Sequence, residues 1–135
     1  MKKQNISHAV MSQRHEEDNS LDDFPTPPWA TRALLKYELK KHNIKKMSCL
    51  EPACHVGHMS RVLEENFKRV VSSDIKNYGY GLKKDYLTSD YKKNSFDWVI
   101  TNPPFNLAEE FFFKSLKIAR IGVALLVRTV FIESS

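Results

Sequence analysis

The sequence lacks any apolar run near the roughly 20 residues that a membrane-spanning helix needs. Its first residues also lack the apolar stretch of a signal peptide, so neither a membrane span nor secretion is expected. Cysteine is scarce: Cys49 and Cys54 form no CxxC motif and have no second cluster, which argues against a disulfide framework and a zinc site. We interpret both as reduced thiols and expect a cytoplasmic protein. Repeats, heptads and long low-complexity tracts are absent too, so the function must be sought in short motifs.

The chain of 135 residues is long enough for one domain with a single core. Its 21 Lys and Arg exceed its 16 Asp and Glu, which gives a formal net charge of +5. Such a charge favours approach to a polyanion but also arises from biased coding, so it permits DNA or RNA and establishes neither. Residues 1–23 are polar with few apolar anchors and are predicted to form a flexible tail, and residues 24–135 the folded domain.

Short apolar segments alternate with helix-like ones after that tail. The predicted strands are 47–50, 70–73, 96–101 and 123–127, and the predicted helices are 29–42, 58–67 and 107–119. This alternation indicates an α/β fold with a mostly parallel sheet, since parallel neighbours need a crossover connection. In such sheets, ligands bind beyond the carboxyl ends of the strands. The motifs that carry chemistry are therefore expected at those ends.

Four motifs stand out, and three of them follow predicted strands. Glu51 to Gly57 is a short loop with a glycine ahead of a helix, which suits close approach of backbone N–H groups to a nucleotide-like ligand. Asp74 ends the second strand, where a carboxylate accepts hydrogen bonds from a ribose diol. Asp85 is a candidate acceptor for an adenine amino group. The fourth and sharpest motif is Asn102-Pro103-Pro104-Phe105.

With these motifs the sequence resembles the class I S-adenosylmethionine-dependent methyltransferases, and most closely those that methylate adenine N6 in DNA. The resemblance covers residues 24 to about 134 and implies a Rossmann-like three-layer sandwich with S-adenosylmethionine as cofactor. The cofactor-binding residues that it implies are Phe24, Thr26, Pro27, Glu51, Pro52, Ala53, Cys54, Gly57, Asp74, Ile75, Asp85 and Tyr86. The catalytic residues that it implies are Asn102, Pro103, Pro104 and Phe105.

The implied chemistry explains these residue types. An exocyclic amine on a purine is a poor nucleophile, because its lone pair is delocalised into the ring. Hydrogen bonds from the amine to the Asn102 side-chain oxygen and the Pro103 carbonyl favour a more tetrahedral nitrogen, whose lone pair points at a sulfonium methyl group. Prolines fix the loop, and Phe105 offers a face for an extruded base. No metal, covalent nucleophile or strong base is required, since positioning and hydrogen bonding carry a direct methyl transfer.

Each motif also has a purely structural interpretation. Asn-Pro-Pro at 102–104 can be a turn after a strand, and Asp74 and Asp85 can be ordinary loop carboxylates. Thr26 can cap the helix that begins near Pro28.

Two further groups of residues have mainly structural interpretations. The phenylalanines at 111–113 are expected to be core and helix-packing residues rather than a stacking platform. A group of lysines is expected to be a solvated helix face, with phosphate contact as the alternative: Lys36, Lys40, Lys41, Lys45 and Lys46.

Two features depart from the family pattern. His55 stands at the first glycine position of the loop, and if the backbone has a positive φ there, the imidazole costs strain and space. The family's sheet also continues with another helix and an antiparallel hairpin, whereas this sequence ends at Ser135. A truncated sheet would expose an edge that a partner, a second copy or a missing segment covers. No length remains for a separate target-recognition domain.

The predicted function is therefore methyl transfer from S-adenosylmethionine to an exocyclic amino group, with adenine N6 in DNA as the preferred substrate. Protein glutamine and the guanine amino group of RNA are alternative substrates, because Asn-Pro-Pro-aromatic loops serve them too. Phe105 favours DNA adenine, since the glutamine and guanine enzymes often carry tyrosine there. A non-catalytic remnant that binds cofactor or nucleic acid is the alternative from a different class.

Overall fold

The computed structural model describes residues 25–127. The predicted tail at 1–23, the cofactor contact predicted for Phe24 and everything after residue 127 lie outside this range. The described chain begins with helix α2 (Pro28–Ala33), which continues as a π-helical segment, η1 (Leu34–Glu38). A 3₁₀ turn, η2 (Ile44–Lys46), then leads into the first strand.

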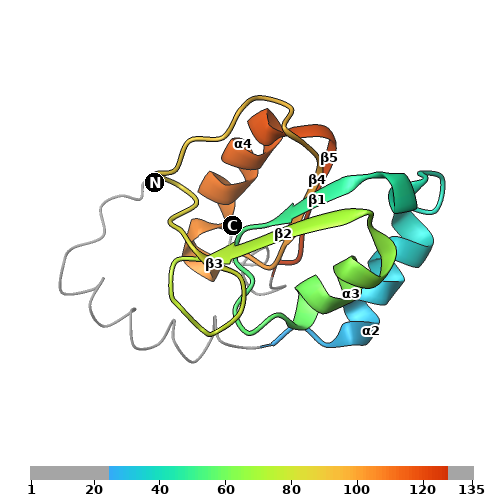
Figure 1. The fold of residues 1–135 in the computed structure, drawn as a ribbon, viewed down its shortest axis with the longest axis horizontal. Helices are drawn as coiled ribbons and strands as arrows, with labels where there is room; N and C mark the ends of the chain where they lie inside the picture. The colour runs from blue at the N-terminus through green and yellow to red at the C-terminus, as the bar shows by residue number, and fades with distance from the viewer. Residues whose placement is uncertain (1–24, 128–135) are drawn as a thin grey trace.

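Five strands form one parallel sheet in the order β3-β2-β1-β4-β5. Their bounds are β1 (Ser48–Glu51), β2 (Arg69–Asp74), β3 (Leu82–Lys83), β4 (Phe96–Thr101) and β5 (Ala119–Leu125). The remaining helices are α3 (His58–Asn66), η3 (Phe105–Leu107) and α4 (Ala108–Ile118). Helices α2 and α3 cover one face of the sheet and α4 covers the other (Figure 1). The predicted α/β fold with a parallel sheet in three layers is confirmed.

The two central strands are buried on both faces, because parallel sheets of this kind carry helices on each side. Successive side chains of β4 alternate between two cores: Trp98 and Ile100 pack toward α2 and α3, and Val99 packs toward α4. Cys49 and Leu50 of β1 divide in the same way. This double burial holds the carboxyl ends of β1 and β4 in fixed positions.

The sequence misplaced β5 and missed β3. Strand β5 begins at Ala119, directly after α4, and so includes the charged Arg120, which pairs with Asp97 of β4 at 2.7 Å between Nη2 and Oδ1. Gly122 also belongs to the strand, where a Cβ would lie 2.6 Å from the ring of Trp98. Strand β3 has only two residues, both exposed, so no hydrophobic pattern marks it.

The expectation that all three phenylalanines of α4 are core residues needs correction. Phe111 is buried, but Phe112 and Phe113 are exposed, because only one stripe of the helix faces the sheet. The buried stripe continues at Ser115 and Ile118.

The predicted lysine cluster is exposed, as a solvated face requires. Lys45 and Lys46 belong to η2, immediately before β1 begins. They therefore lie at the amino end of that strand, opposite to the end where ligands bind in parallel sheets. This position does not favour a phosphate contact beside the predicted site.

Within residues 25–127, no helix is long and apolar enough to cross a membrane. The same range contains no group of three His, Cys, Asp or Glu side chains arranged to hold a metal ion. Cys49 and Cys54 are both buried free thiols.

Candidate cofactor and methyl-transfer site

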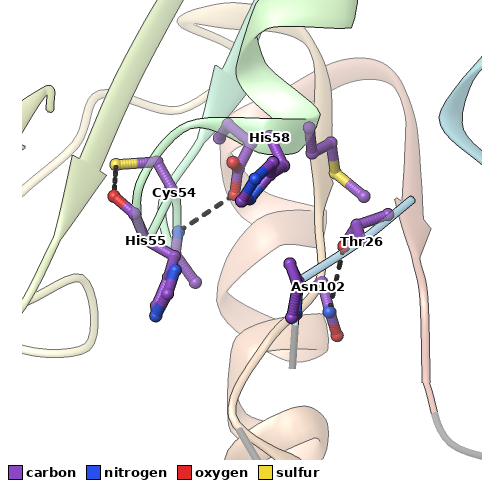
Figure 2. Close-up of a pocket in the computed structure, with 9 residues that line it drawn as sticks. Thr26, Cys54, His55, His58 and Asn102 are labelled. Carbon is purple, nitrogen blue, oxygen red and sulfur yellow. Dashed lines mark hydrogen bonds between the residues drawn. The ribbon is translucent and has the colours of Figure 1, made fainter. Parts of the chain in front are cut away.

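A pocket opens where β1 and β4 end, at the edge of the sheet where the motifs were expected (Figure 2). Its walls come from the segment ahead of α2, the loop after β1, the first turn of α3 and the residue after β4. The lining residues are Pro25, Thr26, Glu51, Ala53, Cys54, His55, His58, Met59 and Asn102. The sequence-predicted site residues among them are Thr26, Glu51, Ala53, Cys54 and Asn102.

Glu51 anchors the pocket through a buried hydrogen-bond network. Its carboxylate accepts from the backbone N–H of Ala53 at 3.2 Å and from Ser60 Oγ at 3.0 Å. Thr101 Oγ1, at the end of β4, donates a third and short bond of 2.5 Å. Ser60 in turn accepts from Ser72 Oγ of β2 at 2.7 Å. The network ties β1, β2, β4 and α3 together and fixes the carboxylate that lines the pocket.

Burial changes the acidity of two groups in this pocket. It raises the pKa of Glu51 to about 7, despite the three hydrogen bonds that oppose the rise, and the charge of Asp74 adds to it. Glu51 is therefore partly protonated near neutral pH, and a positive ligand charge would favour its ionised form. Burial, together with the charges of Glu51 and Asp74, raises the pKa of Cys54 to about 12. Cys54 is thus a neutral thiol and a poor nucleophile at pH 7.

The loop after β1 turns into α3 at Gly57, which has a φ of +96°. A Cβ there would lie 2.9 Å from ring atoms of Tyr80, so the backbone and the packing both require glycine. Tyr80 is held over the loop by a hydrogen bond of 2.8 Å from its hydroxyl to Glu64. The space that the missing side chain leaves is therefore filled by Tyr80, and Gly57 does not line the pocket.

His55 has a φ of +53°, in the left-handed region that favours glycine, so the positive φ considered for this position is present. Its backbone N–H donates to Asp74 Oδ2 at 2.9 Å, and its ring packs 4.2 Å from the ring centre of Tyr78. The other oxygen of Asp74 accepts from the N–H of Lys76 at 3.0 Å. Asp74 thus joins the ends of β1 and β2, and each oxygen keeps a lone pair for another donor.

Replacing His55 with glycine is expected to tighten binding of a ligand in this pocket, because the imidazole occupies space at its wall. The stability of the fold should change by less than about 1 kcal/mol, since relief of the positive-φ strain opposes the greater chain entropy that glycine gives the unfolded state. Calorimetric titration and urea unfolding measure the two quantities. Weaker binding by the His55→Gly variant would show that the ring is itself a contact.

Asn102 extends from the end of β4 toward the segment ahead of α2 (Figure 2). Its Nδ2 donates to Oγ1 of Thr26 at 3.1 Å, although the two residues are 76 positions apart. Thr26 is buried and does not cap the helix: the N-cap of α2 is Pro27, whose carbonyl accepts from the N–H of Ala30. Of the two roles weighed for Thr26, capping is therefore wrong.

The prolines and the phenylalanine of the fourth motif shape the chain after Asn102. Pro103 is buried, and the carbonyl of Pro104 accepts from the N–H of Leu107 at 2.9 Å, which closes the 3₁₀ turn η3. Phe105 begins that turn. These residues lie next to the pocket in sequence but do not line it.

The other predicted site residues lie away from the pocket walls. Ile75 is exposed beside Asp74, and Pro52 is buried. Asp85 accepts from the N–H of Leu87 at 3.1 Å, as a loop carboxylate does. Tyr86 is 2% exposed and packs between the sheet and α4, with its hydroxyl 2.8 Å from Ser115 Oγ, so its side chain belongs to the core.

Sequence reasoning did not assign four lining residues to the site: Pro25, His55, His58 and Met59. Pro25 precedes Thr26, and His55 lies within the loop from Glu51 to Gly57. Their positions beside predicted site residues could have indicated that they line the site. His58 and Met59 form the first turn of α3, directly after Gly57. Met59 also belongs to the core between the sheet and α2. An apolar residue on a helix predicts such a core position but gives no sign that the side chain also lines a pocket.

Solved structures similar to this one are methyltransferases. The protein PH1948 of Pyrococcus horikoshii, assigned as an RNA methyltransferase, matches with a TM-score of 0.61 and 16% identity over 77% of this chain. The 23S rRNA methyltransferase ErmE matches with a TM-score of 0.58 and 14% identity over 74% of this chain. The fold is that of the class I methyltransferases.

A further match with this fold acts on a small molecule. The phosphoethanolamine N-methyltransferase 1 of Haemonchus contortus, solved with phosphoethanolamine and S-adenosylhomocysteine, has a TM-score of 0.57 and 14% identity over 88% of this chain and 32% of its own. This chain spans 60% of the length of PH1948 and 47% of that of ErmE. No family model matches the sequence, and no curated protein does. The similarity is therefore one of fold.

Proposed function

We propose that the chain binds S-adenosylmethionine at the ends of β1 and β2 and transfers its methyl group to an exocyclic amino group held at Asn102. The observation that carries this proposal is the pocket itself. The loop after β1 and the Asn102 motif after β4 are about 50 residues apart in the sequence, yet Glu51 and Asn102 line one cavity. A methyl donor and an acceptor amine have to meet in such a cavity.

The residues around the pocket fit a cofactor with a positive sulfonium group and a ribose. Glu51 offers a buried carboxylate that a cation would stabilise, and the small Ala53 leaves the wall open. Asp74 offers lone pairs to hydroxyl donors at the end of β2. S-adenosylmethionine supplies an electrophilic methyl group on sulfur when it is bound. Asp85, Ile75 and Phe24 remain predicted contacts toward its adenine and methionine ends.

The chain's own part in the reaction is to orient the acceptor amine. With Nδ2 of Asn102 bonded to Thr26, the amide oxygen is the atom left to accept from an amine. The carbonyl of Pro103 is the second acceptor that we propose. Two acceptors hold the two amine hydrogens and leave the nitrogen lone pair directed at the methyl group, so the gain arises in the transition state. Phe105 is the proposed stacking face for the base.

DNA adenine is the substrate that the Asn-Pro-Pro-Phe motif supports, and the net charge of +5 suits a nucleic acid. RNA is the second candidate, because PH1948 and ErmE share the fold and are described as acting on RNA. A cytoplasmic location remains a prediction from the sequence.

Incubation of the protein with methyl-labelled cofactor and separate pools of DNA, RNA and protein tests this proposal. We expect label in DNA, at adenine N6 after nucleoside digestion. Label in RNA alone would support RNA as the substrate. Label in protein glutamine would show that the acceptor is a side-chain amide rather than a base. Cofactor binding without labelling of any pool would contradict methyl transfer and leave a binding protein.

A further inference from the structure

We propose that Thr26 is a positioning residue for Asn102: its hydroxyl holds the Asn102 amide with the oxygen turned toward the acceptor amine. This inference rests on the proposed function and deepens it. The relevant contact is the bond of 3.1 Å from Asn102 Nδ2 to Thr26 Oγ1, across the mouth shared by the α2 segment and the end of β4 (Figure 2).

An asparagine side chain can flip about its Cβ–Cγ bond, which exchanges the positions of its amide oxygen and its NH₂ group. Only one of the two orientations presents an acceptor to an amine, and the other presents a donor that repels it. A partner that accepts from Nδ2 selects the productive orientation. Thr26 is that partner here, since its Oγ1 accepts from Nδ2 at 3.1 Å. A hydroxyl can also donate, so the selection requires that the Thr26 O–H points away from Asn102.

The surroundings of Thr26 disfavour a capping role for its hydroxyl. Thr26 is buried, at 6% exposure, so its hydroxyl does not exchange freely with bulk water. Pro27 and Pro28 follow it and offer no N–H groups for the hydroxyl to cap. The two prolines also fix the backbone, which keeps Oγ1 facing the end of β4.

Valine and serine substitutions at position 26 separate the hydroxyl from the packing. Thr26→Val keeps the volume and removes the bond to Asn102, whereas Thr26→Ser keeps the hydroxyl. Thr31 provides a matched control: it is 1% exposed in α2, and its hydroxyl has no hydrogen-bond partner among residues 25–127. Thr31→Val therefore removes a buried hydroxyl without removing a bond, and it should leave turnover unchanged.

The first measurement needs no activity: the two Nδ2 protons of Asn102 are followed by nitrogen-15 NMR, with assignment by their loss in Asn102→Asp. We expect one proton to be shifted downfield and slow to exchange with water in the wild type and in Thr26→Ser. In Thr26→Val we expect both protons to have the chemical shifts and the fast water exchange of a free asparagine side chain. Identical spectra for the wild type and Thr26→Val would overturn the inference, whether or not the protein transfers methyl groups.

The second measurement is turnover at saturating cofactor, with cofactor affinity measured beside it. We expect Thr26→Val to lower kcat about tenfold, which corresponds to about 1.4 kcal/mol, with cofactor affinity and the activity of Thr26→Ser near those of the wild type. Loss of cofactor affinity at unchanged kcat would overturn the positioning role in favour of a cofactor contact. If the wild type transfers no methyl group at all, the proposed function fails, and the NMR result alone decides the orientation of the amide.

Discussion

Replacement of Asn102 with alanine is expected to lower the turnover of methyl transfer by roughly a hundredfold or more, about 2.7 kcal/mol or more in activation free energy. The amide oxygen is one of the two acceptors that we propose for the acceptor amine, and its contribution arises mainly in the transition state. Cofactor affinity should change far less, because the loop after β1 and Asp74 supply most of the proposed cofactor contacts. Initial rates at saturating cofactor measure the turnover, and calorimetric titration measures the cofactor affinity.

A matched asparagine provides the control. Asn66 ends α3, and its Nδ2 donates to the carbonyl of Val62 at 2.8 Å, away from the pocket. Asn66→Ala removes the same amide and one hydrogen bond, so it should reduce stability slightly and leave turnover unchanged. If Asn102→Ala turns over as fast as Asn66→Ala, the amide has no part in the chemistry.

The buried carboxyl of Glu51 should make the stability of the protein depend on pH. Its pKa is about 7 in the fold and 4.5 in the unfolded chain, so the folded state keeps a proton that the unfolded state has lost. The free energy of unfolding therefore falls as the pH rises from about 4.5 to 7, by on the order of 3 kcal/mol. Glu51→Gln removes this contribution, so its stability relative to the wild type should rise over that range.

Urea unfolding of both proteins at pH 5, 6, 7 and 8 measures the difference between their free energies of unfolding. The titration of groups that both proteins share cancels in this difference. Glu110→Gln is the control: it removes an exposed carboxyl of α4, and its curve should run parallel to that of the wild type. Parallel curves for Glu51→Gln as well would contradict the raised pKa. If the free energy of unfolding of Glu51→Gln minus that of the wild type decreased from pH 5 to pH 8, the pKa of Glu51 would be lowered in the fold rather than raised.

The architecture and the position of the motifs were accessible from the sequence. The mainly apolar run 96–101 coincides with β4, because a strand covered on both faces is rich in apolar residues. The loop after β1 was recognisable because Gly57 needs a left-handed backbone and a helix follows it. The positive φ considered for His55 is present as well.

Other features depend on contacts between distant segments and left no local pattern. The bond from Asn102 to Thr26 joins positions 76 apart, and the short bond from Thr101 to Glu51 joins positions 50 apart. Tyr86 follows Asp85 in the predicted adenine motif, but α4 supplies Ser115 for its hydroxyl, so it packs inward. Burial decides such cases, and a sequence motif does not record burial.

Calorimetric titration of the folded protein with S-adenosylmethionine and S-adenosylhomocysteine tests the central claim most directly. We predict binding of one ligand per chain, weakened by about 1–3 kcal/mol in Asp74→Ala, as for the loss of hydrogen bonds to a charged group, and unaltered in the exposed-loop variant Asp90→Ala. A folded wild-type protein that gives no heat with either ligand at millimolar concentration would contradict the account.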